Sequence, residues 1–201
     1  GQRNTVNGLQ REFVGDIFSI ENSLSSRRLT GSVAANWTPL SWLTARGTVG
    51  LDQANHFGYR LQRRGEGTRV GQVWGPTAQE GGRDFSRADV TRITVDLGGT
   101  ANWQATENLS TRTSVGLQWF NDKNTRGEGR GYGLPPGAYA PNAARQRESW
   151  EFTTENATYG AYIEEQFGWR ELAYLTLGVR TDQNSAFGRS VGNTVYPRAA
   201  L

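Results

Sequence analysis

The sequence predicts an all-β protein, and more specifically a segment of an antiparallel transmembrane β-barrel with about seven long strands. Three observations predict this class. Apolar side chains recur at every second residue in six segments, the connections between the segments alternate between short and long, and tryptophans lie at the segment ends. A transmembrane helix is excluded, because no apolar run approaches the roughly 20 residues that it needs.

Alternation with a period of two residues is the main secondary-structure signal. Leu97 and Gly99, for example, alternate with Asp96 and Gly98. In all six segments the odd-numbered side chains form the apolar face, and Glu165 is its only charged residue. Such a pattern predicts strands with one dry face and one wet face. The segments are 29–37, 43–51, 93–103, 109–119, 157–167 and 173–179.

The expected strands and connections match those of a membrane barrel. Strands of about 10 to 13 residues are longer than the usual strand but long enough to cross a bilayer at a tilt. Short turns on one side and long loops on the other are typical of outer-membrane barrels. Short turns are expected at 38–41, 104–108 and 168–171. Long loops are expected at 53–91, 120–156 and 183–195.

Tryptophans mark both ends of the expected strands. Four of them flank the short turns, namely Trp37, Trp42, Trp103 and Trp169. Trp119 and Trp150 flank a long loop at the other end, and Trp74 lies within a loop. Aromatic residues gather in this way at the two interfaces between membrane and water.

Several chemical functions are excluded or disfavoured by the residues present. The chain has no cysteine and a single histidine, His56, so we expect no disulfide, metal site or cofactor. Glu164 and Glu165 are neighbours on a strand and face opposite sides, so they cannot share a catalytic site. The glycine-rich segment 127–133 lacks the strand-then-helix context of a phosphate loop, and a flexible loop is expected there. We therefore predict neither an enzyme nor, with basic residues scattered, a nucleic-acid partner.

The long loops hold residues suited to binding a ligand, because recognition residues concentrate on loops of a rigid scaffold. The candidates are aromatic and arginine side chains: Trp74, Tyr132, Tyr139, Arg63 and Arg130, with Arg64, Arg83 and Arg126 as further arginines. A different, structural role is expected for Arg180 and Asp182. They should form an ion pair that braces the loop 184–188.

The segment 158–201 carries a recognisable combination of motifs. A tyrosine-rich strand ends in Glu165-Gln166, and it is followed by a strand with Arg-x-Asp, an Asn-Ser-x-Phe-Gly loop and Tyr-Pro. The residues of these last motifs are Arg180, Asp182, Asn184, Ser185, Phe187, Gly188, Tyr196 and Pro197. In this combination the segment resembles the C-terminal half of TonB-dependent outer-membrane receptors of the SusC/RagA type. Gln183 departs from the pattern, which more often has glycine at that position.

The resemblance implies a 22-stranded barrel in the cell outer membrane, an N-terminal plug domain and energy supplied through TonB. Residues 1–201 would then be part of the barrel domain, and the plug domain and TonB box would lie outside this chain. Such receptors import a bulky nutrient, an oligosaccharide or a peptide, often with a SusD-like surface lipoprotein as partner. The resemblance is silent on the substrate.

Two alternatives remain open from the sequence. One is a receptor of the same barrel class that imports a siderophore or another metal chelate. The other is a soluble all-β binding module, whose strands would also alternate. A requirement for detergent during extraction separates the barrel readings from the soluble module.

Overall fold

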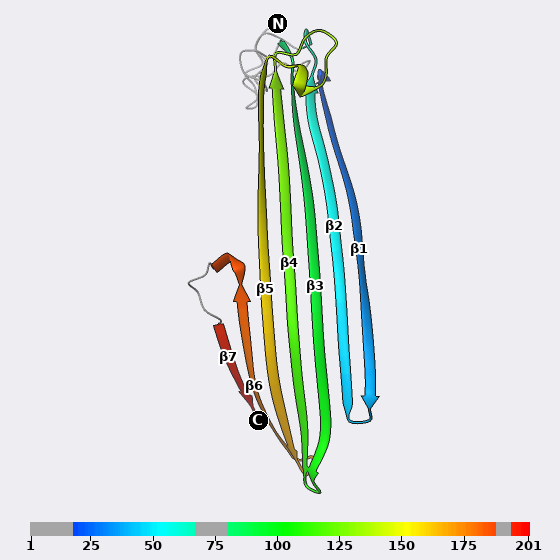
Figure 1. The fold of residues 1–201 in the computed structure, drawn as a ribbon, viewed down its shortest axis with the longest axis vertical. Coiled ribbons are helices and arrows are strands. Elements are labelled where there is room, and N and C mark those ends of the chain that lie inside the picture. The colour runs from blue at the N-terminus through cyan, green and yellow to red at the C-terminus, as the bar shows by residue number, and fades with distance from the viewer. Residues whose placement is uncertain (1–17, 67–79, 188–193) are drawn as a thin grey trace, which may run out of the picture. The chain divides into compact units, whose positions relative to one another are not determined.

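The computed structural model of this chain describes residues 18–66, 80–187 and 194–201. These residues form one sheet of seven strands, which lie side by side in chain order (Figure 1). The strands are β1 (Ile20–Leu40), β2 (Leu43–Gln62), β3 (Gly82–Thr106), β4 (Leu109–Tyr132), β5 (Gln146–Trp169), β6 (Ala173–Asn184) and β7 (Thr194–Ala200). The short 3-10 helices η2 (Pro141–Ala143) and η3 (Ser185–Phe187) lie in connections. The predicted all-β class is confirmed.

Neighbouring strands run antiparallel and pair residues of the same parity. In the β5–β6 pair Glu165 lies opposite Leu177 and Tyr162 lies opposite Arg180. In the β6–β7 pair Arg180 lies opposite Tyr196. Odd residues therefore stay beside odd residues across these ladders, which keeps the apolar side chains on one face. Among the described strands, β1 and β7 are the two edges.

The strands are longer than the alternation predicts. β1 to β5 contain 21, 20, 25, 24 and 24 residues. The expected long loops shrink accordingly, and the stretch 133–145 alone connects β4 to β5. The prediction of a flexible loop at 127–133 is wrong, because residues 127–132 belong to β4. Backbone pairing continues there although the apolar pattern has ended.

Each of the three short turns overlaps its predicted segment, but the connections observed are 41–42, 107–108 and 170–172, because the strands extend further than predicted. In the connection between β5 and β6, Arg170 and Glu171 have φ values of 50° and 59°. This left-handed region is unusual for residues other than glycine. The Arg170 backbone N–H donates to the Asn108 carbonyl at 2.9 Å, and its Nε donates to Asn108 Oδ1 at 3.0 Å. These bonds hold the β5–β6 turn against the β3–β4 turn.

The chain divides into two compact units. Unit 1 comprises residues 1–28, 54–89 and 124–153, and unit 2 comprises residues 29–53, 90–123 and 154–201. A small buried core lies in unit 1, where Leu61, Leu134 and Ala144 pack together with Tyr59 beside them. None of the described helices has the length and apolar character needed to span a membrane.

Candidate functional site: two sheet faces and a charged groove

Within the six alternating segments, the odd-numbered side chains of unit 2 form an apolar face that no second layer of the described residues covers. The exposed fraction is 74% for Val33, 58% for Leu117 and 45% for Leu177. Aromatic rings gather on the same face: Trp42 stacks on Trp103 with 6.1 Å between ring centroids. In water, so much contiguous apolar surface would favour association. The face is therefore suited to an apolar medium.

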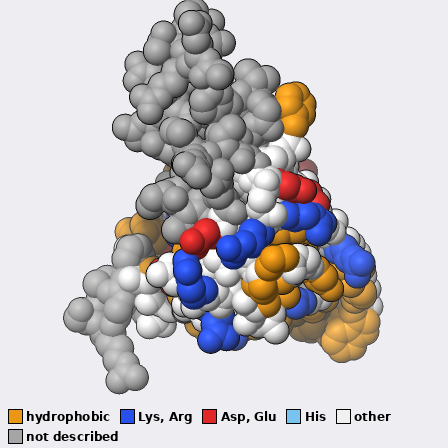
Figure 2. Space-filling model, turned by 90° about the horizontal axis from the view of Figure 1, so that it is seen from above, with side chains coloured by type: hydrophobic (Ala, Val, Ile, Leu, Met, Phe, Trp, Pro, Cys, Tyr) orange, Lys and Arg blue, Asp and Glu red, His pale blue; other side chains and the backbone are white. Residues whose placement is uncertain are grey.

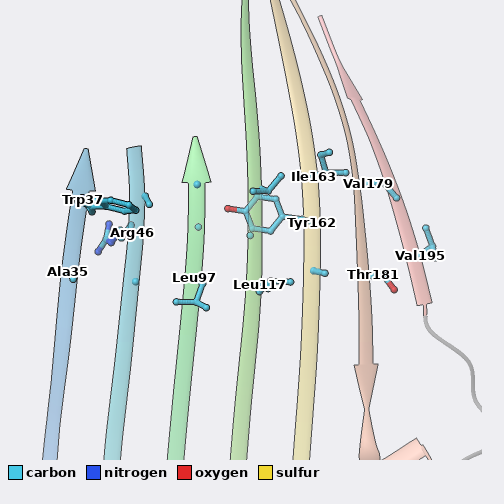
Figure 3. Close-up of a pocket in the computed structure, with 17 residues that line it drawn as sticks. Ala35, Trp37, Arg46, Leu97, Leu117, Tyr162, Ile163, Val179, Thr181 and Val195 are labelled. Atoms are coloured by element: carbon cyan, nitrogen blue, oxygen red, sulfur yellow. The ribbon is translucent and has the colours of Figure 1, made fainter. Parts of the chain in front are cut away.

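A shallow depression with a volume of about 800 Å³ crosses this apolar face (Figure 3). Small residues such as Ala45, Gly47 and Gly99 leave it open, and Leu97 and Leu117 are larger side chains beside them. The lining residues come from all seven strands, from Ala35 on β1 to Val195 on β7. The depression is thus a property of the sheet surface and not of a loop.

The even-numbered side chains of unit 2 form a polar face, which holds a network of ion pairs. Arg92 lies 3.7 Å from Asp52 and 3.2 Å from Asp122. On β5 and β7, Glu164 and Arg198 pair at 2.9 Å. These opposite charges therefore offset one another across strands on the polar face.

The aromatic ring of Tyr162 packs over a glycine on this polar face. A Cβ built on Gly116 would lie 2.1 Å from Tyr162 Cε1, well inside van der Waals contact. Only glycine therefore fits at this position with the ring in place. The contact couples the neighbouring strands β4 and β5 on the polar face.

The expected Arg180–Asp182 ion pair is present, with 2.9 Å between Nη2 and Oδ1. Arg180 also donates to Gln118 on β4 at 2.8 Å, so it links β6 to β4 across the intervening strand β5. The start of the following loop is held by other residues. Asn184 Nδ2 donates to Thr158 Oγ1 at 2.8 Å, and Ser185 Oγ accepts from the Ala157 backbone N–H at 2.8 Å.

The remaining motif residues have separate positions. Tyr196 and Pro197 lie on β7 opposite Arg180 and Val179. Phe187 ends η3, and Gly188 lies outside the described residues. The bracing role predicted for Arg180 and Asp182 on the whole loop 184–188 therefore stays a prediction.

Unit 1 contains a charged groove with a volume of about 540 Å³. Its charged residues come from three strands and are Arg60, Asp84, Arg126, Glu128 and Arg130. Asp84 lies between two arginines: its Oδ2 is 2.8 Å from Arg60 Nη2, and its Oδ1 is 3.6 Å from Arg130 Nε. Arg126 pairs with Glu128 at 2.6 Å.

One corner of the groove combines a cation, a carboxylate and an aromatic ring. The Arg130 guanidinium lies 4.9 Å from the centroid of the Trp150 ring, which is cation–π distance. Asp84 Oδ1 is buried and accepts no hydrogen bond within the described residues. This oxygen is not accessible to a ligand, whereas a ligand's carboxylate or hydroxyl could bind the partly exposed arginines.

The predicted ligand-binding residues are only partly brought together. Arg130 lines the groove, but it lies on β4 and not in a loop. Tyr132 is the last residue of β4, and Tyr139 lies in the β4–β5 connection with 59% of its surface exposed. Trp74 lies outside the described residues. The loop bounds predicted around these residues were wrong, because pairing extends the strands.

Arg63 forms an ion pair with an acidic residue, and its role in ligand binding stays a prediction. Its Nη2 lies 2.8 Å from Glu21 Oε1. The hydrogen bond and charge of Glu21 raise the pKa of the Arg63 guanidinium. Neighbouring Arg64 donates to the Leu134 carbonyl at 3.4 Å, and Arg83 donates to the Tyr139 carbonyl at 3.0 Å. These arginines anchor the β4–β5 connection.

Basic side chains are prominent at the end of the molecule seen from above (Figure 2). Among the atoms not drawn in grey, Lys and Arg are more numerous on this face than Asp and Glu. Within the described residues, no group of three or more His, Cys, Asp or Glu side chains is arranged to hold a metal ion.

Sequence reasoning missed Arg60, Asp84 and Glu128 as groove residues, and it missed the contact of Trp150 with Arg130. Each lies in a stretch where polar side chains and glycine hide the period of two. The signal that could have found them is the strand register, since Arg60 and Asp84 are 24 residues apart. The sequence alone does not give the register of β2 against β3, so it does not reveal that Arg60 and Asp84 are in contact.

The comparisons with known proteins show the fold. No protein-family model and no curated protein matches the sequence. A solved structure of the RagAB peptide transporter matches 91% of this chain with a TM-score of 0.77 and 14% identity. The RagAB peptide importer matches in its open-open state with a TM-score of 0.75, 14% identity and 91% coverage. Its closed-closed state gives 0.72, 16% and 90%.

This chain covers 20% of each of those matched chains, so it spans about a fifth of their length. At these identities the likeness concerns the fold alone. The described sheet, with its antiparallel strands in chain order and two open edges, has the fold of a barrel segment of a RagA-type TonB-dependent transporter, as the resemblance of residues 158–201 predicts.

Proposed function

We propose that this chain is part of the barrel domain of a TonB-dependent transporter in the cell outer membrane, which imports a bulky nutrient. The observation that carries the proposal is the two-faced sheet of unit 2 in the fold of a RagAB segment. Its apolar face exposes Val33, Leu117 and Leu177, while its polar face holds the ion pairs of Arg92. Lipid covers such an apolar face, and a wet lumen suits such a polar face.

Within bulky nutrients, we propose a peptide as the first substrate class to test and an oligosaccharide as the second. The likeness to RagAB, a peptide transporter, supports this order. The groove of unit 1 supports it as well, because the partly exposed guanidinium of Arg130 can bind the carboxylates and amide carbonyls of a peptide. We assign the groove as a contact site for the passing substrate.

The proposed transporter works with partners and not as an enzyme. A SusD-like surface lipoprotein would capture the nutrient, a partner suggested by the two-component RagAB assembly. TonB would supply energy through a region outside this chain. Lipid of the outer membrane would surround the barrel, and no cofactor is needed for this transport.

The test is nutrient uptake by cells that produce the complete transporter. Removing the transporter should abolish uptake of labelled peptides, and replacing Arg130 with Gln should lower it. The matched control is Arg87→Gln, because Arg87 also lies in unit 1 but outside the groove, and its pair with Asp89 is long, at 3.7 Å. Its uptake should equal that of the unchanged protein.

Three results would count against the proposal, each against a different part. Recovery of the protein in the aqueous fraction without detergent would contradict the membrane barrel. Uptake of peptides and oligosaccharides that is independent of the transporter would contradict the nutrient class. Equal uptake by the Arg130 and Arg87 variants, with both barrels folded, would contradict the role of the groove.

A further inference from the structure

The charged groove of unit 1 exposes its arginines more than its carboxylates. The side chains of Arg60, Arg126 and Arg130 are between 42% and 46% exposed. Those of Asp84 and Glu128 are each 19% exposed. Three positive groups therefore reach solvent beside two negative groups that are largely covered, so the groove presents a basic surface to a ligand.

All five charged side chains of the groove lie on one face of the sheet in unit 1. They have even residue numbers and belong to the neighbouring strands β2, β3 and β4. Side chains alternate between the two faces of a strand, so residues of equal parity share a face along it. The contacts across strands agree, because Asp84 on β3 pairs with Arg60 on β2 and with Arg130 on β4. A ligand above β3 therefore has an arginine on each side.

Arg130 has hydrogen-bonding capacity that the described residues do not use. Its Nε lies 3.6 Å from Asp84 Oδ1, which is ion-pair distance but too long for a hydrogen bond. A guanidinium has five N–H donors, and within the described residues Arg130 donates no hydrogen bond. Its N–H groups therefore suit the oxygen atoms of a ligand.

The neighbours of the arginines position them without saturating their donors. The Trp150 ring lies 4.9 Å from the Arg130 guanidinium and restricts it, but an aromatic ring supplies no oxygen to its N–H groups. Asp84 holds Arg60 at 2.8 Å, and Glu128 holds Arg126 at 2.6 Å. The arginines are thus held in place before a ligand arrives, which lowers the entropy that binding would cost.

We propose that the groove selects peptides with acidic side chains, and that Arg130 together with Arg60 binds a side-chain carboxylate of the passing peptide. This inference rests on the proposed function, in which the groove contacts the substrate. The groove volume of about 540 Å³ accommodates an Asp or Glu side chain with the adjoining backbone. Asp84 and Glu128 are positioning residues, which hold the arginines and do not contact the peptide.

The charge of the groove distinguishes an acidic peptide from neutral and basic peptides. A carboxylate is attracted by the opposite charge of a guanidinium and can accept two hydrogen bonds from it side by side. The side chain of a glutamine in the peptide offers one neutral carbonyl oxygen instead. A lysine in the peptide is repelled by the arginines, and the carboxylates of the groove are already paired.

The experiment measures the affinity of the complete transporter, purified in detergent, for three fluorescent peptides. The peptides have blocked ends and one common sequence, except that a central position carries Glu, Gln or Lys, and binding is followed by fluorescence anisotropy. At low salt the Glu peptide should bind about tenfold more tightly than the Gln peptide, the effect of one charge-assisted contact, and the Lys peptide should bind most weakly. The preference for Glu should shrink in about 1 M NaCl, because salt screens partly exposed charges.

Arg130→Gln should remove the preference for the Glu peptide over the Gln peptide. This substitution leaves no carboxylate without a partner, because Asp84 keeps its 2.8 Å pair with Arg60. Arg87→Gln is the matched control and should keep the preference, because Arg87 lies in the same unit but outside the groove. A heat-modifiable band on gels checks that each variant is a folded barrel. The salt series on the unchanged protein tests the same charge contact without any substitution.

Equal affinity for the three peptides, in a folded transporter that still imports peptides, would overturn the inference and leave the proposed function standing. So would a preference for Glu that survives Arg130→Gln or high salt. Tighter binding of an oligomer of galacturonic acid than of the Glu peptide, lost on Arg130→Gln, would overturn the peptide assignment and give the arginines to an acidic oligosaccharide. Cells that import neither peptides nor oligosaccharides through the transporter would refute the proposed function itself.

Discussion

The contact between Tyr162 and Gly116 allows a prediction with a calculable size. Replacing Gly116 with Ala puts a methyl group 2.1 Å from Cε1, 2.5 Å from Cζ and 2.8 Å from Oη of Tyr162. The ring must retreat by roughly 1.5 Å to reach ordinary contact distance. Overpacking of this kind costs about 1–3 kcal/mol. We expect the complete barrel to lose that much of its free energy of unfolding.

The assay is denaturant unfolding of the purified transporter in detergent, followed by the heat-modifiable band. Gly31→Ala is the control, because nothing lies within 4 Å of a Cβ at that position on β1. The substitution should be neutral or slightly stabilising. Alanine lowers the conformational entropy of the unfolded chain, which raises the free energy of unfolding by about 0.4–1 kcal/mol.

A double-mutant cycle isolates the contact itself. In a Tyr162→Ala background the ring is gone, so Gly116→Ala should cost little. The coupling energy between the two substitutions should be about 1–3 kcal/mol. If Gly116→Ala costs the same with and without the Tyr162 ring, the glycine is not required by that ring and the reasoning fails.

Three other predictions test the faces, the sidedness and the core of the sheet. Leu177→Arg should cost about 2–4 kcal/mol of barrel stability in lipid, and Thr94→Arg on the polar face should cost far less; equal costs would contradict the assignment of faces. Single cysteines at Thr106 and Tyr139 should be labelled by an impermeant thiol reagent on intact cells only at position 139, and the opposite pattern would invert the orientation. Leu134→Ala removes a side chain with 0% exposure and should destabilise the β4–β5 connection by about 2–5 kcal/mol, seen as faster limited proteolysis there; unchanged proteolysis would show that the core does not hold the connection.

Alternation predicted the part of the sheet where the two faces differ in polarity. Leu97 and Asp96 alternate visibly, so both the strand and its faces could be predicted from sequence. The short turns could be predicted as well, because the alternation of apolar and polar residues stops at each turn in a short segment that contains polar residues, proline or glycine. Glu165 and Glu164 occupy opposite faces, as adjacent strand residues must.

The charged groove could not be predicted for the same physical reason. Around Arg130 the side chains on both faces are polar or absent, so the contrast that reveals a strand vanishes while backbone pairing persists. The pair of Asp84 with Arg60 depends on the register of β2 against β3. No local pattern encodes that register, which arises only when long strands pair over their whole length.

The two edge strands of the described sheet require further strands to pair with, and the composition of the two faces fits such a closed barrel. Among the described strands, β1 and β7 each leave one row of backbone N–H and C=O groups without a strand partner. In lipid each unsatisfied group costs several kcal/mol, so strands outside the described residues must complete the pairing before the sheet can span a membrane. The ion pairs of Arg92 and Arg180 fit such closure, because charges on a face enclosed by a barrel must be neutralised locally. On the odd-numbered face, Glu165 accepts a hydrogen bond from Thr113, and Glu155 pairs with Lys123 beyond the apolar segments. In a closed barrel, the odd-numbered apolar residues would face the lipid and the even-numbered polar residues would face the wet interior.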